Sequence, residues 1–294
     1  MKRLIADLSI ACGVYLIWFI LVYYGNDIPL ILLFLAGGYV TCLHGSLQHI
    51  AVHGYPTRWR WLNTLIVYPP LAFYFPYVTY RTSHLEHHRV ETLTDVETDP
   101  ESVYVTKSHW DQLSSISKAV YRFNFTLAGR LLIGPFTSLY LLWKDQARRI
   151  ISGDLECALT WLIHIAACVA IGLFVSTVAQ LPVWKYLLCF AYPGISMTLL
   201  RSYTEHRWSA REGERSIIVE GSPISRLLYL NNNYHWVHHE NPGLPWQDVS
   251  KEFNKRRSEI LQANGDFYYK GYLQMFARFF KDRLIDPIHP AQAN

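Results

Sequence analysis

The chain has 294 residues, of which 51% are hydrophobic, 15% aromatic and only 17% charged. Soluble domains contain about 25% charged residues, so this composition excludes an ordinary water-soluble or disordered protein and indicates a membrane protein. The net charge of +4, from 27 basic and 23 acidic residues, is too small an excess to indicate binding to nucleic acid.

The first two apolar runs predict a helical hairpin in the membrane. They cover residues 4–24 and 28–43 and are joined by Gly25, Asn26 and Asp27. Each is near the roughly 20 residues that a helix needs to cross the hydrocarbon core, and the second can extend into the residues that follow. A secretory signal is the alternative for the first run, but its apolar part is long and no small-residue cleavage site ends it.

Two further apolar stretches, Leu62 to Tyr80 and Phe125 to Trp143, are long enough to be mistaken for spans. Basic residues near both ends of each stretch place both ends in the cytoplasm, because basic residues favour the cytoplasmic side of a membrane. Neither stretch can therefore be a single membrane crossing, which would place its ends on opposite sides. The first contains three prolines and the second contains Arg130. We therefore expect helices that lie in the interface or enter it partway.

A second hairpin is predicted from spans over residues 158–179 and 183–200, with only three residues between them. Basic residues flank the inner ends of all four spans, whereas both short turns lack them, which places both termini in the cytoplasm. The polar segments 81–124 and 201–294 are expected to form a cytoplasmic helical cap. The predicted fold is thus an all-α integral membrane protein with four transmembrane helices in two hairpins, interfacial helices and this cap, in one domain over residues 1–294.

Cysteine and histidine are distributed differently. The five cysteines are odd in number and form no C-x-x-C pair, so neither a disulfide framework nor a zinc knuckle is expected. Most of the 13 histidines are clustered, and the pattern H-x-x-H-H occurs twice, where chance placement predicts about 0.025 copies. Positions i, i+3 and i+4 share one helix face, so each copy directs three imidazoles to one point, as metal binding requires. The two copies are His84, His87 and His88, and His235, His238 and His239.

A third group, His44, His49 and His53, lies where the second span should reach the cytoplasm. His49 and His53 are spaced i, i+4 and face the same way, whereas His44 and His49 diverge by about 140° on an ideal helix. We favour His49 and His53, with His44 as the alternate ligand. His206 follows the fourth span at the same membrane face and is a further candidate. His164, inside the third span, and the isolated His109 and His289 are interpreted as packing or surface residues.

The favoured set holds more nitrogen donors than one metal can use and predicts a site for two. Imidazole binds iron, copper, nickel and zinc, but a structural zinc would be closed by four ligands, whereas a redox pair keeps positions open for oxygen; we therefore favour iron. Carboxylates are expected to hold the ligand tautomers. The predicted metal ligands are His49, His53, His84, His87, His88, His206, His235, His238 and His239, and the carboxylates nearest in sequence are Glu86, Glu205, Asp95 and Asp99.

These motifs resemble the three histidine boxes of the membrane-bound fatty acid desaturase superfamily, over most of the chain. Residues 49–54 resemble the first box, 84–88 the second and 235–239 the third. The surrounding segments 94–102, 201–206 and 231–246 resemble a bacterial branch. The first box departs from the family pattern because Ile50 stands where an acidic residue often follows the first histidine.

The resemblance implies an oxygen-dependent enzyme of the bacterial inner membrane, with two iron ions and a cytoplasmic site. Such an enzyme takes two electrons from a separate donor, such as a ferredoxin, and removes hydrogen from an unactivated C–H bond of an aliphatic chain. Lys255, Arg256 and Arg257 belong either to a solvated helix face or to the donor's docking face.

The expected product is a C=C bond in a fatty acyl chain. The histidine boxes leave open a hydroxylase or ketolase of the same superfamily, or a desaturase of a small amino-acid-derived metabolite such as dihydrorhizobitoxine.

Two non-redox alternatives also account for many histidines. A metal transporter predicts ionisable ligands near the bilayer midplane, where only His164 is found. A zinc-dependent hydrolase needs a carboxylate base beside a three-ligand site, which Glu86 could supply, but nine converging histidines exceed that need.

Overall fold

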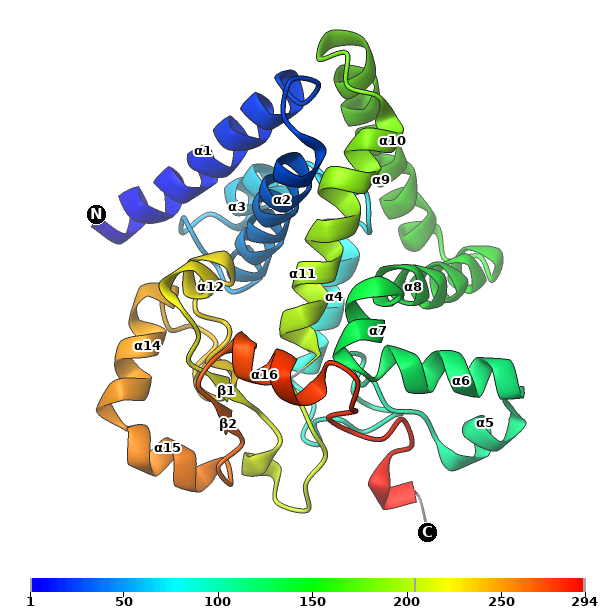
Figure 1. Ribbon diagram of the computed structural model, residues 1–294, viewed down its shortest axis with the longest axis vertical. Helices are drawn as coiled ribbons and strands as arrows, with labels where there is room; N and C mark the ends of the chain where they lie inside the picture. The colour runs from blue at the N-terminus through cyan, green and yellow to red at the C-terminus, as the bar shows by residue number, and fades with distance from the viewer. Residues whose placement is uncertain (1, 204, 293–294) are drawn as a thin grey trace. The chain divides into compact units, whose positions relative to one another are not determined.

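The computed structural model describes residues 2–203 and 205–292. Two compact units make up the chain: the first comprises Met1–Thr82 and Pro135–Thr198, and the second Ser83–Gly134 and Leu199–Asn294. The ranges of the second unit are similar to the polar segments 81–124 and 201–294. Figure 1 draws both units and labels most of their helices and the two strands.

The first unit contains the membrane-length helices. Its elements are α1 (Lys2–Tyr23), α2 (Leu30–Val52), α3 (Arg60–Val67), most of α8 (Gly134–Ile151), α9 (Leu155–Leu173), the π-helix η1 (Phe174–Val178), α10 (Val183–Tyr186), the π-helix η2 (Leu187–Ala191), and the first residues of α4 (Tyr77–His87) and α11 (Tyr192–Ser202).

Within the described residues, four helices are long and apolar enough to cross a membrane, as the sequence predicts. They cover Arg3–Tyr23, Leu30–Val52, Leu155–Val178 and Val183–Ser202. The second continues past the expected end near residue 43 to Val52, so that His49 of the first histidine box lies in its last turn and His53 directly follows it. Asp154 directly precedes the third, and its carboxylate caps the helix by accepting a hydrogen bond from the backbone N–H of Cys157.

The two other apolar stretches form no membrane-length helix. The first is divided into α3 and α4, because Pro69, Pro70 and Pro76 lie between them and cannot continue a helix. The second is divided into α7 (Leu127–Leu132) and α8. Their expected position at the membrane interface stays a prediction.

Glycines allow α2 to pack closely against η2 and α11. A Cβ atom on Gly37 would lie 2.4 Å from the Cys189 carbonyl oxygen, and one on Gly38 would lie 2.6 Å from Pro193 Cβ. Gly194 makes the reciprocal approach, since its Cβ would lie 2.7 Å from Thr41 Cβ. Small residues at such contacts let helix backbones approach in a membrane, where no hydrophobic effect drives association.

Gly37→Ala should therefore lower the stability of the detergent-solubilised protein by about 1–3 kcal/mol, because the added methyl group overpacks the contact. Gly13→Ala is the matched control, since a Cβ at Gly13 meets nothing within 4 Å. Thermal unfolding compares the two. Equal unfolding midpoints would show that the close contact at Gly37 does not hold these helices together.

The second unit is built from short helices and one small parallel sheet. Its elements are the end of α4, α5 (Lys107–Gln112), α6 (Ser115–Asn124), α7, the end of α11, the 3₁₀-helix η3 (Glu212–Glu214), β1 (Ile218–Val219), α12 (Pro223–Leu228), α13 (His235–Glu240), α14 (Trp246–Lys255), α15 (Arg257–Ala263), β2 (Tyr268–Tyr269), α16 (Tyr272–Phe279) and the 3₁₀-helix η4 (Pro290–Gln292). Thr106, Ser114, Thr126 and Ser222 cap the first turns of α5, α6, α7 and α12.

Strand β1 divides the interior of the second unit into two apolar clusters. Ile217 and Val219 pack into one cluster with residues of β2 and α16, whereas Ile218 packs into the other with α13, α14 and α15. This alternation is the two-residue period of a strand. Because both clusters are anchored on one short segment, β1 fixes the position of the third histidine box that follows it.

Candidate metal centre

The second histidine box forms the end of α4. His84 and His87 lie in its last turn, and His88 continues the turn by donating its backbone N–H to the His84 carbonyl at 3.1 Å. His84 and His87 are 2% and 1% exposed. The helical spacing thus places the three imidazoles on one face, where His84 and His87 are buried and His88 is half-buried.

The third box begins α13, and the backbone fixes its direction. Val237 packs into the apolar cluster on one side of β1, and the Trp236 N–H donates to the Ile217 carbonyl at 3.0 Å. Leu230 and Asn231, with φ of 46° and 58°, adopt the left-handed conformation that turns the chain before the box. These constraints direct His235, His238 and His239 away from the apolar cluster.

His206 reaches the same place from a different segment. It pairs with Ser216 in an isolated antiparallel bridge, and the Ile217 N–H donates to the Glu205 carbonyl at 3.1 Å. Residues 216–217 therefore hold the segment after α11 on one side and the start of α13 on the other. His206 and His235 are brought together although they belong to no common motif.

Four imidazoles converge inside the second unit, and we call them the histidine tetrad: His87, His206, His235 and His239. His87 Nε2 lies 3.1 Å from His206 Nε2 and 3.3 Å from His239 Nε2. His235 Nε2 lies 3.0 Å from the Nε2 atoms of both His206 and His239. All four ligand atoms lie within 4.8 Å of one another, a group that could hold a metal ion.

The partners of the other ring nitrogens explain why the Nε2 atoms are free to bind a metal. His87 Nδ1 lies 2.7 Å from the Asp99 carboxylate, which only accepts, so the proton is on Nδ1 and the lone pair on Nε2. His235 Nδ1 faces the Asn232 side-chain oxygen at 3.2 Å, and His206 Nδ1 faces the Ser216 hydroxyl at 3.2 Å. His87 and His235 thus direct Nε2 lone pairs into the tetrad, where a cation would bind them.

The spacing of the tetrad fits a single ion. Two nitrogens bound to one metal at about 2.1 Å and at right angles lie about 3.0 Å apart, and tetrahedral ligands lie about 3.4 Å apart. The four Nε2 contacts of 3.0–3.3 Å lie in this interval. The donor set and its geometry therefore suit a divalent transition metal.

Burial keeps three tetrad imidazoles neutral, which a ligand requires. It lowers the pKa of His206 to about 3, with a further contribution from His87. Burial and the neighbouring imidazoles also lower the pKa of His235 and His239 well below the ordinary value. For His87, burial acts in the same direction, but the hydrogen bond to Asp99 and the Glu101 charge outweigh it and raise the pKa. The same carboxylate makes His87 a more basic ligand.

A second group of imidazoles adjoins the tetrad. His88 Nε2 lies 3.2 Å from His84 Nε2 and 3.0 Å from His238 Nε2. The His88 ring also stacks on His239 of the tetrad, with ring centroids 4.4 Å apart. The second unit thus brings together seven of the nine predicted histidines.

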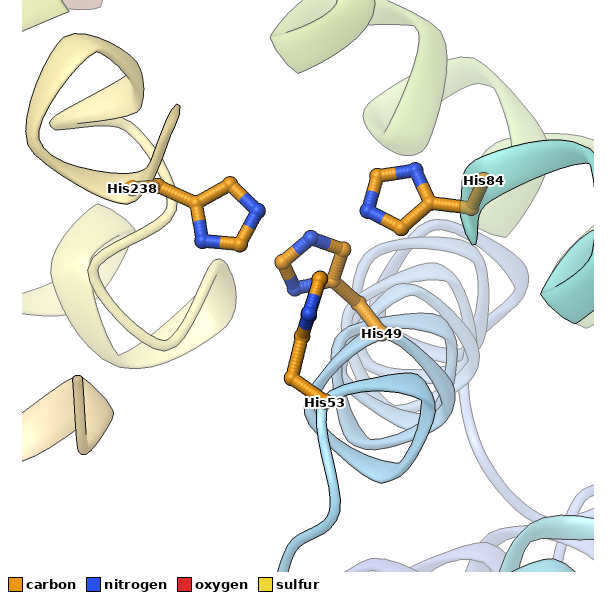
Figure 2. A group of neighbouring side chains, drawn as sticks. All are labelled: His49, His53, His84 and His238. Atoms are coloured by element: carbon orange, nitrogen blue, oxygen red, sulfur yellow. The ribbon is translucent and has the colours of Figure 1, made fainter. Parts of the chain in front are cut away.

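The other two lie at the end of α2 in the first unit, with His49 in its last turn and His53 directly after it. His49 and His53 project from the same side of this helix, as Figure 2 shows, with ring centroids 5.0 Å apart. His44 is placed differently, because its Nε2 lies 3.1 Å from the Tyr15 hydroxyl, which donates to the Ile66 carbonyl. Since that hydroxyl has one proton, His44 Nε2 must be the donor to it. His44 Nε2 therefore lacks the lone pair that a ligand atom needs.

The carboxylates around the imidazoles differ in part from those expected. Glu86 is exposed, because it lies about 200° around α4 from His84. Its expected place is taken by Glu101, which accepts a hydrogen bond from His84 Nδ1 at 2.9 Å. Asp99 holds His87, as described above, whereas Asp95 accepts hydrogen bonds from Glu97 and Thr98 in its own loop.

Glu205 is buried beside the tetrad and is paired with Arg201 at 2.8 Å. Its carboxylate lies 3.5 Å from His235 Nδ1. Burial raises the pKa of Glu205, and Arg201 partly offsets this effect. Burial would also raise the pKa of Glu101, but His84, His87 and Arg201 hold it below its ordinary value. Glu205 is among the carboxylates expected from the sequence and Glu101 is not, although Glu101 stands two residues after Asp99.

The remaining histidines lie outside both groups. His109 is exposed on α5, and His164 contacts Cys168 on α9 with its Nε2 3.5 Å from the sulfur. His289 is buried against the rings of Tyr104 and Trp208.

The basic cluster on α14 and α15 is largely engaged in ion pairs within the chain. Arg256 pairs with Glu240 at 2.6 Å and with Glu259 at 2.6 Å. Arg257 pairs with Glu220 at 2.5 Å and stacks on Phe253. These contacts leave less charge for a partner than the run of three basic residues indicates.

Membrane-length apolar helices and clustered imidazoles define a membrane protein with a metal-binding type of site. Residues 26–272 match the sequence profile described as fatty acid desaturase, and the chain belongs to this family. No curated protein is significantly similar to the chain. Membership implies an oxidoreductase of the desaturase or hydroxylase type, with a membrane setting and a lipid substrate; the family generally uses two iron ions.

Proposed function

We propose that the chain is an oxygen-dependent desaturase that introduces a C=C bond into a fatty acyl or related aliphatic chain. The observation that carries the proposal is the tetrad, in which four Nε2 atoms converge within 4.8 Å while carboxylate, amide and hydroxyl oxygens face the Nδ1 atoms of His87, His235 and His206. Four nitrogens at spacings near those of right-angle coordination would leave two positions of a six-coordinate iron ion open for oxygen, whereas a tetrahedral zinc would be closed by them.

The nine histidines divide between two ions in this proposal. The tetrad holds one ion. His84, His88 and His238 are assigned to the other, because His88 Nε2 lies close to the Nε2 atoms of both partners. His49 and His53 are assigned to the same ion from the first histidine box of the sequence. Figure 2 draws four of these five side chains.

Two bound iron ions would supply the activation of dioxygen and the removal of hydrogen from the substrate. The balanced reaction takes two hydrogens from adjacent carbons and, with O₂, two electrons and two protons, releases an alkene and two water molecules. The electrons come from a separate ferredoxin-like donor in this proposal. The residues of the chain orient the ligands, with Asp99 and Glu101 holding the protons on His87 and His84. We place the enzyme in a bacterial inner membrane, with its site and both termini on the cytoplasmic side.

Profiling of lipids and metabolites tests the reaction. Cells that express the chain should accumulate a product lacking two hydrogens, and cells that express His238→Ala should not. A product that gains oxygen would make the chain a hydroxylase. No oxidised lipid or metabolite in cells that contain the iron-loaded protein would overturn the proposal.

The contribution of the first unit is tested separately. His49→Ala should leave the tetrad ion in place and lose the second, so iron analysis should find about one ion per chain and activity should be lost. His44→Gln is the control, because its amide can still donate to Tyr15 and it should keep two ions. Full iron content in His49→Ala, or loss of iron in His44→Gln, would reassign the first box.

A further inference from the structure

The exposed apolar residues of the second unit are confined to one group of helices. In the described part of this unit, eight large apolar side chains are exposed, by 40–86%, and all lie on α6, α7, α12 or α16, or directly after α16. They are Ile116, Val120, Phe123, Leu132, Ile224, Leu227, Leu273 and Phe280. No such side chain lies on α5, α13, α14 or α15 in the described part of the unit.

These helices are neighbours. Helix α7 contacts both α6 and α16, and its Ala128 N–H donates to the Phe280 carbonyl at 3.1 Å. Helix α12 joins the group through Tyr229 at its end, whose ring lies 5.3 Å from that of Tyr272 on α16. The exposed side chains therefore belong to one connected set of helices, which we call the apolar platform.

Helix α6 shows how unusual this exposure is for a soluble surface. Ile116, Val120 and Phe123 are spaced i, i+4 and i+7, so they share one face, and they are 78%, 40% and 42% exposed. A surface helix of a soluble domain turns such a stripe inward. An outward stripe needs a partner that covers it.

The charges of the platform favour a lipid surface as this partner. The helices α6, α7, α12 and α16 contain no acidic residue and five basic ones. Two of them, Arg130 and Arg226, donate to Ser202 and Ser250 within the unit, so the headgroup contact rests on Lys118, Arg122 and Arg278. In contrast, α14 and α15 carry Asp248, Glu252 and Glu259. Apolar side chains interleaved with basic ones are typical of helices that lie in a membrane interface and contact anionic headgroups.

The platform is also attached at the end of a membrane span. The membrane-length helix Val183–Ser202 enters the second unit at Leu199. The next residue after it, Tyr203, donates its hydroxyl to the Phe125 carbonyl, between α6 and α7, at 2.8 Å. This bond fixes the junction of the two platform helices to the point where the span ends.

We propose that the apolar platform lies on the bilayer, with its apolar side chains at the boundary of headgroups and acyl chains and its basic residues against anionic headgroups. The proposal concerns how the second unit meets the membrane, and it does not depend on the reaction that the enzyme catalyses.

Fluorescent labels on single cysteines test this contact in the full-length protein. A background without Cys12 and Cys168, the two native cysteines that are not buried, receives Ile116→Cys, Leu273→Cys or, as the control on α14, Lys251→Cys. The Lys251 side chain is 74% exposed. Each protein is labelled with an environment-sensitive dye and reconstituted into vesicles of phosphatidylcholine and phosphatidylglycerol.

Labels at 116 and 273 should emit at shorter wavelength than the label at 251. They should be quenched several-fold more by nitroxide lipids and several-fold less by aqueous iodide. Iodide quenching equal to that at 251 would overturn the proposal. Shielding of the labels from both quenchers would also overturn it, because it would show that a protein partner covers the platform and not lipid. A larger share of phosphatidylglycerol in the vesicles should increase nitroxide quenching of the label at 116. The double substitution Lys118→Gln and Arg122→Gln should remove this increase. If quenching did not increase with phosphatidylglycerol when both basic residues are present, their proposed role would be contradicted.

Discussion

His206→Ala should remove the ion of the histidine tetrad and lower turnover by more than about 100-fold, beyond the 10- to 100-fold effect typical of residues that only support a ligand. His206 Nε2 contacts both His87 and His235, so its loss removes one of the four donors of the tetrad. Iron content per chain and product formation measure the two effects. The His206 variant is informative because this residue lies outside the H-x-x-H-H pattern.

His109→Ala is the matched control for this variant. His109 is exposed on α5 and lies outside both groups of imidazoles, so its iron content and activity should equal those of the unmodified protein. A His206→Ala protein that keeps two iron ions and full turnover would show that the tetrad is not a metal site.

Asp99→Asn should lower iron affinity or turnover about 10- to 100-fold, the range found for partners that orient a metal-bound histidine. Asp99 is 5% exposed and accepts from His87 Nδ1 at 2.7 Å. An amide has half the acceptor capacity and no charge, so it fixes the Nδ1 proton less firmly and makes His87 a weaker donor to metal. Iron titration of the metal-depleted protein measures the affinity.

Asp95→Asn provides the comparison within the same loop. Asp95 accepts its hydrogen bonds from Glu97 and Thr98 through one oxygen, Oδ1, and an asparagine oxygen can accept them equally. Iron affinity in Asp95→Asn should stay unchanged. If Asp99→Asn and Asp95→Asn behaved alike, Asp99 would have no specific role in orienting His87.

The histidine boxes were predictable because helical periodicity acts over a few residues. His84 and His87 share a face by spacing alone, and the same rule separates His44 from His49. The four spans were predictable for a similar reason, since length and apolarity suffice to identify them. The end of the second span was not predictable from apolarity. Its last turns contain polar histidines, and α2 continues through them to Val52 because they face the interior of the protein.

The supporting residues could not be predicted because the loop and the strand bring them in from a distance. Glu101 lies 17 residues from His84 and contacts it through a loop, whereas the near neighbour Glu86 points outward. Asn232 and Ser216 reach the tetrad through the turn before α13 and the bridge to His206. Likewise, the run from Lys255 to Arg257 gives no sign that Glu220 and Glu240 pair with two of its members.

The second unit combines a buried site and an exposed surface of different chemistry. The tetrad is buried and rich in imidazole, with His87 and His235 both 1% exposed, whereas the apolar platform is exposed and basic. Strand β1 and the residues beside it link the two, because Ile217 and Val219 pack with α16 while Ile218 packs with α13. A substitution in this strand is therefore expected to disturb metal binding and lipid contact together.

Metal analysis of the purified, detergent-solubilised protein tests the central claim most directly. The account predicts two iron ions per chain in the unmodified protein, and about one in both the His206→Ala and the His49→Ala variants. One zinc ion per chain, or iron content unaffected by either substitution, would contradict the assignment of two histidine-bound iron ions.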